Sequence, residues 1–251
     1  MTARSTSASG SRVAMVQIWI PVTPEAGNPS EVEKALARMT NAKPASDPKS
    51  SPRQTLSREA WVKAARKVLE KRGIAEVKID RLARHFKVTR GSFYFHFSSL
   101  KDLHDELLNE WRRANCAPFE AKRDVTDIDG LQFFTEIVHI WVDEKPFSPL
   151  LDLAVRDWSR TSKALGREVA AMDDLRITLL QRAFRAMGYG PEESLVRARL
   201  TYFHQIGQYA LSFKEDPEQR RRHGPIYGKV LLAPLVQEPN LPKDWQDTEG
   251  K

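Results

Sequence analysis

The apolar positions of this chain recur mainly at intervals of three and four residues, which is the spacing of one face of an α-helix. This period holds through most of the chain after residue 56 and breaks at glycine and proline. It predicts helices over residues 57–72, 79–86, 90–97, 100–111, 130–142, from 150 onward, 167–187 and 191–213. We therefore predict an all-α fold.

The first of these helices has recognisable ends. Ser57 is placed to cap its start, and Gly73 follows its last residue, where glycine commonly ends a helix. Trp61 falls on the apolar stripe and is predicted to lie in the core. Four basic residues are predicted on the solvent side: Lys63, Arg66, Lys67 and Lys71.

The stretch from Ile79 to Lys101 predicts two short helices joined by a tight corner. Val88 and Thr89 form the corner, and the Thr89 hydroxyl is predicted to cap the second helix. That helix, residues 90–97, should bury Phe93 and Phe97. Its open side then carries Arg90, Gly91, Ser92, Tyr94, Phe95 and His96. A short helix with cations, small residues and aromatic rings on its free face suits the major groove of DNA.

These residues resemble a known signature. The run VTRGSFYFHFSSLKDLHDELL, preceded by IDRLARHFK, is similar to the DNA-binding motif of the tetracycline-repressor (TetR) family of bacterial regulators. One position departs from the family pattern, because Leu100 stands where many members have a lysine, and Lys101 follows it. The resemblance implies an N-terminal three-helix helix-turn-helix head and a C-terminal helical-bundle body for ligand binding and dimerisation. It also implies a homodimeric regulator, most often a repressor, on a pseudo-palindromic operator.

The resemblance assigns roles to individual residues. Arg90 would contact a base or phosphate, Gly91 would allow close backbone approach, and Ser92 would reach a base edge. Tyr94 and His96 would bond phosphates. The full predicted DNA-binding set is Lys78, Thr89, Arg90, Gly91, Ser92, Tyr94, Phe95, His96 and Lys101.

The charge distribution favours the same partner, double-stranded DNA. Residues 53–101 contain 13 basic and four acidic residues, an excess of nine positive charges, whereas the whole chain carries a net charge of +7. The remainder is therefore slightly acidic. A positive excess confined to about a fifth of the chain is the expected footprint of a surface for an anionic polymer.

For the body, the resemblance implies that the helix starting at Leu100 connects the head to an effector site. An unidentified small-molecule effector is expected to meet bulky side chains in the body, predicted as Trp111, Phe133, Phe134, Ile137, Trp141, Trp158 and Leu179. The last two long helices are expected to pair with those of a second subunit through Met172, Leu175, Leu179, Ala183, Tyr202, Ile206 and Tyr209. The alternative is a dimeric DNA-binding or interaction protein without an inducer.

Other chemistries have weaker support. Glu136 and His139 form a single Glu-x-x-His pair, whereas a di-iron bundle needs two such pairs and two further carboxylates. His104 and Asp105 are expected on a solvent-facing side, and we find no phosphate loop, nucleophile elbow or Cys/His metal cluster. We predict that the protein is not an enzyme and uses no cofactor or metal.

The predicted organisation has four parts. They are a mostly disordered extension (residues 1–52), the helix-turn-helix head (53–101), the effector and dimerisation body (102–235) and a tail (236–251). The single cysteine, Cys116, is expected as a free buried thiol, which favours a reducing cytoplasm. No apolar run approaches the roughly 18 residues of a membrane span, so no membrane partner is expected.

Overall fold

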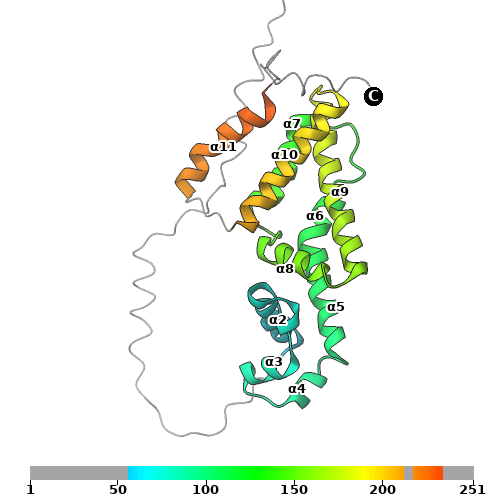
Figure 1. Cartoon of the computed structure of the whole chain (residues 1–251), viewed down its shortest axis with the longest axis vertical. Coiled ribbons are helices and arrows are strands. Elements are labelled where there is room, and N and C mark those ends of the chain that lie inside the picture. The colour runs from blue at the N-terminus through cyan, green and yellow to red at the C-terminus, as the bar shows by residue number, and fades with distance from the viewer. Residues whose placement is uncertain (1–55, 212–216, 234–251) are drawn as a thin grey trace, which may run out of the picture. The chain divides into compact units, whose positions relative to one another are not determined.

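The computed structural model describes residues 56–211 and 217–233, and every regular element in these residues is helical. The all-α prediction is thus confirmed. The helices are α2 (Arg58–Arg72), α3 (Ile79–Phe86), α4 (Arg90–Tyr94), α5 (Leu100–Trp111), α6 (Ala117–Glu120), α7 (Gly130–Val142), α8 (Pro149–Ser159), α9 (Lys163–Ala186), α10 (Pro191–Ala210) and α11 (Pro217–Leu232) (Figure 1). A short 3-10 turn, η2 (Ile74–Glu76), follows α2, and a π-helical turn, η3 (Arg112–Cys116), follows α5.

The chain divides into two compact units, and α11 belongs to a different unit from α2–α10. It contains Pro225 within its length and exposes Ile226 and Val230. The predicted N-terminal extension and the tail from residue 236 lie outside the described residues.

An aromatic core holds α2, α3 and α4 together as the head. Trp61 of α2 is fully buried, and its ring meets Phe86 at 5.0 Å and Phe93 at 5.4 Å, both edge-on. Phe93 in turn stacks on Phe97 at 5.1 Å. Edge-to-face and offset ring pairs at these distances add to the energy of burial. The predicted core positions of Trp61, Phe93 and Phe97 are confirmed.

The corner between α3 and α4 differs in part from the prediction. Lys87 takes the left-handed conformation (φ 55°), and the Val88 N–H donates to the Ala83 carbonyl at 3.0 Å. Helices often end on a residue in this left-handed conformation, which is usually glycine but is a lysine here. Thr89 does occupy the N-cap of α4, but its side chain makes no capping hydrogen bond.

Helix α4 is also shorter than predicted, because it ends at Tyr94 and not at Phe97. Phe97 reaches the core from the turn that follows. The shorter helix places Phe95 and His96 in the link to α5.

Helix α5 leads from the head into the body. Its start is capped by Ser99, whose side chain accepts from the Asp102 N–H. Leu103, Leu107 and Trp111 form its buried stripe. The π-helical turn η3 follows directly, which the sequence pattern did not indicate.

The long helices of the body agree with the predicted pattern, with shifted ends. Helix α9 begins at Lys163, four residues before the predicted start, and α10 ends at Ala210. The two lie side by side as an antiparallel pair (Figure 1). Gly188 between them has φ 95°, a conformation that favours glycine.

Helix α7 packs closely on the end of α9. A Cβ atom at Gly130 would lie 2.6 Å from the Ala183 carbonyl and 2.7 Å from the Met187 nitrogen. Only glycine therefore allows the start of α7 to approach α9 this closely.

The centre of the body contains a buried ion pair. Arg176 of α9 is 1% exposed and Asp152 of α8 is 3% exposed. The guanidinium donates to both carboxylate oxygens of Asp152, at 3.1 and 3.2 Å, and to the Asn115 carbonyl of η3 at 2.9 Å. Trp111 Nε1 donates to the same carboxylate at 3.0 Å. Arg176 and its hydrogen-bond partners thus connect α9 to α8 and η3 directly, and to α5 through the shared Asp152 carboxylate.

We predict that Arg176→Met destabilises the protein by roughly 3–5 kcal/mol, because the buried Asp152 carboxylate then keeps only the more distant Arg156, at 3.8 Å, as a cationic neighbour. Urea unfolding followed by circular dichroism measures the change. In the double variant Arg176→Met/Asp152→Asn, the amide oxygen still accepts from Trp111 and no charge is buried. The double variant should recover part of the lost stability. A loss of less than about 1 kcal/mol in Arg176→Met alone would contradict the account.

Candidate nucleic-acid interface

The predicted recognition surface is exposed. Tyr94 is 52% exposed and Phe95 is 88% exposed, which is unusual for aromatic side chains in a folded domain. Arg90 keeps 61% of its side chain accessible, and His96 is half-buried. Their neighbour Phe93 is fully buried and anchors the segment. The segment therefore presents rings and a cation outward while its other face is fixed in the core.

The other predicted DNA contacts surround this segment. Thr89 and Gly91 are exposed and Ser92 is partly exposed. Lys78 lies at the start of α3 and pairs with Glu76 at 3.4 Å. Lys101, in the first turn of α5, is 80% exposed and pairs with Asp105 at 2.6 Å. Their roles in binding stay predictions.

An ion pair orients Arg90. Its Nε lies 3.2 Å from an Asp80 carboxylate oxygen of α3, and both side chains are more than 60% exposed. Exposed pairs of this kind contribute about 0–1 kcal/mol. The pair can therefore position the guanidinium without preventing it from turning to another acceptor.

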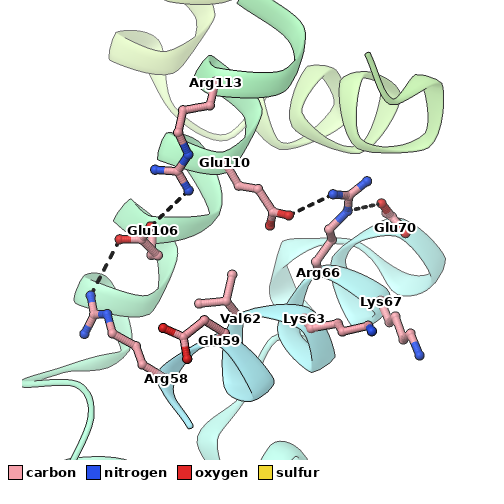
Figure 2. Close-up of a pocket in the computed structure, with 10 residues that line it drawn as sticks. All are labelled: Arg58, Glu59, Val62, Lys63, Arg66, Lys67, Glu70, Glu106, Glu110 and Arg113. Carbon is pink, nitrogen blue, oxygen red and sulfur yellow. Dashed lines mark hydrogen bonds and ion pairs between the residues drawn. The ribbon is translucent and has the colours of Figure 1, made fainter. Parts of the chain in front are cut away.

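Arg58 ties the end of the recognition segment to α5. Its guanidinium donates to the His96 carbonyl and to the Asp102 carboxylate, the latter at 3.0 Å. It also lies over the Phe97 ring, 4.2 Å from the centroid. Figure 2 shows this side of α2, where Glu106 of α5 lies between Arg58 and Arg113 and pairs with both.

Arg66 makes a second link and corrects the prediction that it lies on the solvent side. Its side chain is only 27% exposed, because it bonds Glu70 at 2.7 Å and Glu110 of α5 at 2.8 Å (Figure 2). Its third nitrogen donates to the hydroxyl of Ser148, the N-cap of α8, at 2.7 Å. A single head residue is thus bonded to two elements outside the head.

The head matches a family model. Residues 62–107 match the model described as bacterial regulatory proteins, tetR family. The match to the TetR family thus covers the head and the first part of α5. This match agrees with the prediction that the head is the DNA-binding domain of a transcriptional regulator.

The solved structures that are similar to this chain include two at low identity. One is described as BioQ with its natural double-stranded DNA operator, at 21% identity and a TM-score of 0.35, covering 70% of this chain and 96% of that one. The other is the multidrug binding protein EbrR complexed with imidazole, at 17% identity and a TM-score of 0.38, covering 76% of this chain and 99% of that one. No curated protein matches the chain.

The predicted effector residues lie at separate places in the body, and all except the half-buried Trp158 are buried. Trp111 and Trp141 lie near the buried ion pair, since Trp111 bonds Asp152 and the Trp141 ring is 6.0 Å from that of Tyr202, a partner of Arg176. Trp158 instead faces His104. Phe133, Phe134, Ile137 and Leu179 are also buried, and Phe133 lines a cavity of about 150 Å³. The effector site stays a prediction.

Five of the seven predicted dimer residues are buried within the single chain. Leu179 and Ala183 are fully buried inside one chain, Tyr202 is 3% exposed, and Met172 and Leu175 are also buried. These side chains pack mainly within the subunit, and their part in a dimer interface stays a prediction. Ile206 and Tyr209 are partly exposed.

Helix α10 has an unusual distribution of side chains in the single chain. Its buried positions are mostly polar: Ser194, Arg197, Ala198, Thr201, Tyr202 and Gln205. Its exposed positions include Val196, Leu200 and Phe203, at 54%, 57% and 58% exposure. Their spacing of four and three residues places them on one face. Both faces carry apolar residues, so the sequence pattern alone did not identify the outer one.

His104 of α5 corrects a further prediction, since it is not fully solvent-facing. Its ring meets Trp158 of α8 edge-on at 5.5 Å and hydrogen-bonds the backbone of Val77 in the head. Burial lowers the pKa of His104 below its ordinary value, although the bond to Val77 opposes this. The neutral ring therefore packs where the head, α5 and α8 meet.

Other titratable groups have structural partners. Glu136 pairs with Lys122, and burial raises the pKa of the Cys116 thiol to about 12. The predicted free buried state of Cys116 is confirmed. Across the part of the chain that is described, His, Cys, Asp and Glu form no group of three suited to a metal ion, and the helices there are too short or too polar to cross a membrane.

We predict that His104→Gln reduces the acid sensitivity of the fold. The unfolded histidine takes up a proton near pH 6.5, whereas the folded one resists protonation, so its contribution is complete above about pH 6.5 and declines as the pH falls toward the lowered folded pKa. Urea unfolding at about pH 7.5 and 5.5 measures this dependence. The wild type should lose more stability on acidification than the variant. An equal loss in both would contradict the lowered pKa of His104 in the folded protein.

Proposed function

We propose that this protein is a TetR-family regulator that binds a pseudo-palindromic operator as a homodimer and acts as a repressor in the cytoplasm. The observation that carries the proposal is the exposed segment around Arg90, Tyr94 and Phe95, held by the buried rings of Trp61 and Phe93. In a helix-turn-helix dimer, the recognition helices enter major grooves about one helical turn or a multiple apart.

The proposal divides the contacts into two kinds. Arg90 and Ser92 would read base edges, Tyr94 and His96 would bond phosphates, and Phe95 would meet thymine methyl groups or sugar. Lys78 and Lys101 would add phosphate contacts. Phosphate contacts position a protein on DNA, whereas base contacts distinguish sequences.

The outer face of α10 supports the proposed dimer. An apolar face with a polar inner side is costly for an isolated subunit, because Val196, Leu200 and Phe203 remain in water. A second copy of the same pair α9–α10 would cover this face by two-fold symmetry. The interface proposed from the structure thus centres on Val196, Leu200 and Phe203, with Ile206 and Tyr209 from the sequence prediction beside it.

We propose further that a small-molecule effector binds the body and lowers operator affinity through α5. The bonds of Arg58 and Arg66 to acids of α5 support this, because a displacement of α5 would move the head with it. Such coupling is typically 1–3 kcal/mol and is reciprocal. The alternative is a dimeric regulator without an inducer. A compound that raises the melting temperature would favour sensing.

Substitutions at the recognition segment should produce two different defects. Arg90→Ala should cost roughly 1–3 kcal/mol of operator affinity and relax sequence preference, because it removes a hydrogen-bond donor to a base edge. Tyr94→Phe should weaken binding to operator and random duplexes by similar factors, because it removes only a hydrogen bond to phosphate. Fluorescence anisotropy with both duplexes measures the affinities. Equal losses of affinity from the two variants on every sequence would refute the division into base-reading and phosphate-binding residues.

Substitution at the outer face of α10 should dissociate the dimer. Phe203→Glu should cost roughly 2–4 kcal/mol, because it removes an aromatic contact and places a charge in the interface. The dissociation constant then rises about 30- to 700-fold, as measured by sedimentation velocity over a dilution series. Leu150→Glu, at another exposed leucine (62%), is the matched control. Unchanged association of the Phe203 variant would exclude this face.

A further inference from the structure

Helix α2 borders two grooves of different charge. The groove between α2 and α5, drawn in Figure 2, has a volume of about 540 Å³ and is lined by five cations and four glutamates. The groove between α2 and α3 has a volume of about 430 Å³, and no acidic residue lines it. Its lining is Ala64, Lys67, Val68, Lys71, Arg72, Arg81, Leu82, Arg84 and His85.

Three of the five cations of the first groove are neutralised by glutamates that line the same groove. Arg58, Arg66 and Arg113 all form ion pairs with glutamates there (Figure 2). In the second groove, Arg81 pairs with Glu76 from outside the lining. Among the described residues, Lys67, Lys71, Arg72 and Arg84 have no ion pair, and all four are exposed.

Helix dipoles account for part of this charge only. The last turns of α2 and α3 both border the groove, and basic residues are favourable near helix C-termini. Each C-terminus is equivalent to roughly half a negative charge. Two termini therefore balance about one of the four unpaired cations, and the groove stays strongly positive.

We infer that the α2–α3 groove is a second DNA contact, which binds the phosphate backbone of the duplex without reading its sequence. The inference rests on the proposed function and extends it beyond the recognition segment. An open groove with several unpaired cations suits an extended anionic polymer. The positive excess of residues 53–101 supports DNA as this polymer, since Arg90 is the only arginine or lysine within α4.

The test uses the full chain and a random-sequence duplex. Lys71→Gln/Arg84→Gln should weaken binding at low salt and reduce the steepness of the salt dependence. The slope of log affinity against log salt should fall by about 0.9 for each phosphate that the variant no longer neutralises. Lys163→Gln/Arg167→Gln removes one lysine and one arginine from exposed positions of α9 and is the control for net charge. Equal slopes for the two double variants would overturn the inference.

A single-residue comparison on α2 is a closer control. Lys63 and Lys71 are both exposed, but Lys63 lines the α2–α5 groove and Lys71 lines the α2–α3 groove. Lys71→Gln should lower affinity for the random duplex more than Lys63→Gln, and equal effects would count against a specific contact. If the wild type itself ignores duplex DNA at low salt, the proposed function fails; if only the groove variants behave like their controls, this inference alone fails.

Discussion

The guanidinium of Arg176 has to be neutralised inside the body, and several features of the body serve this purpose. A buried charge without a partner would cost several kcal/mol, so Asp152 of α8 is held against it. The Asn115 carbonyl of the π-helical turn accepts a further hydrogen bond from Arg176. Because Trp111 at the end of α5 bonds the same Asp152, the position of α5 depends on this ion pair.

From this centre, hydrogen bonds continue to the head. The Asn115 side chain donates to the Ser148 carbonyl at 2.9 Å, and Arg66 of α2 donates to the Ser148 hydroxyl. A contiguous polar path therefore runs from α9 to the first helix of the head. Regulation would in addition require two discrete arrangements of α5, and the proposed effector would act by favouring one of them. The fixed base of the recognition segment and the path from Arg176 would then be parts of one mechanism.

Hydrophobic periodicity was sufficient to predict most helices and the aromatic core of the head, because Trp61, Phe93 and Phe97 fall on the apolar faces that helical spacing defines. It did not predict that Arg176 is buried or that Arg66 is half-buried, because hydrophobic periodicity treats every arginine as a polar residue. The left-handed Lys87 and the π-helical turn gave no signal, because neither depends on a glycine or proline. Ion pairs between helices far apart in the sequence cannot be derived from local spacing.

The outer surfaces were harder to predict than the core. Helix α10 is apolar on two sides, so a choice between them requires knowledge of what packs on each side in the folded chain. The choice made from periodicity selected Tyr202, which lies inside, and omitted Phe203, which lies outside. The motif around Arg90 was easier to predict, because its exposed rings and cation follow a family pattern that lies within one continuous stretch of the sequence.

The central claim is that two copies of this chain hold one duplex through their recognition segments. Selection of bound duplexes from a random library by the full chain tests it most directly. The account predicts an enriched inverted repeat with half-sites about one helical turn, or a small multiple, apart. Enrichment of a single unrepeated half-site, or of no sequence at all, would contradict it.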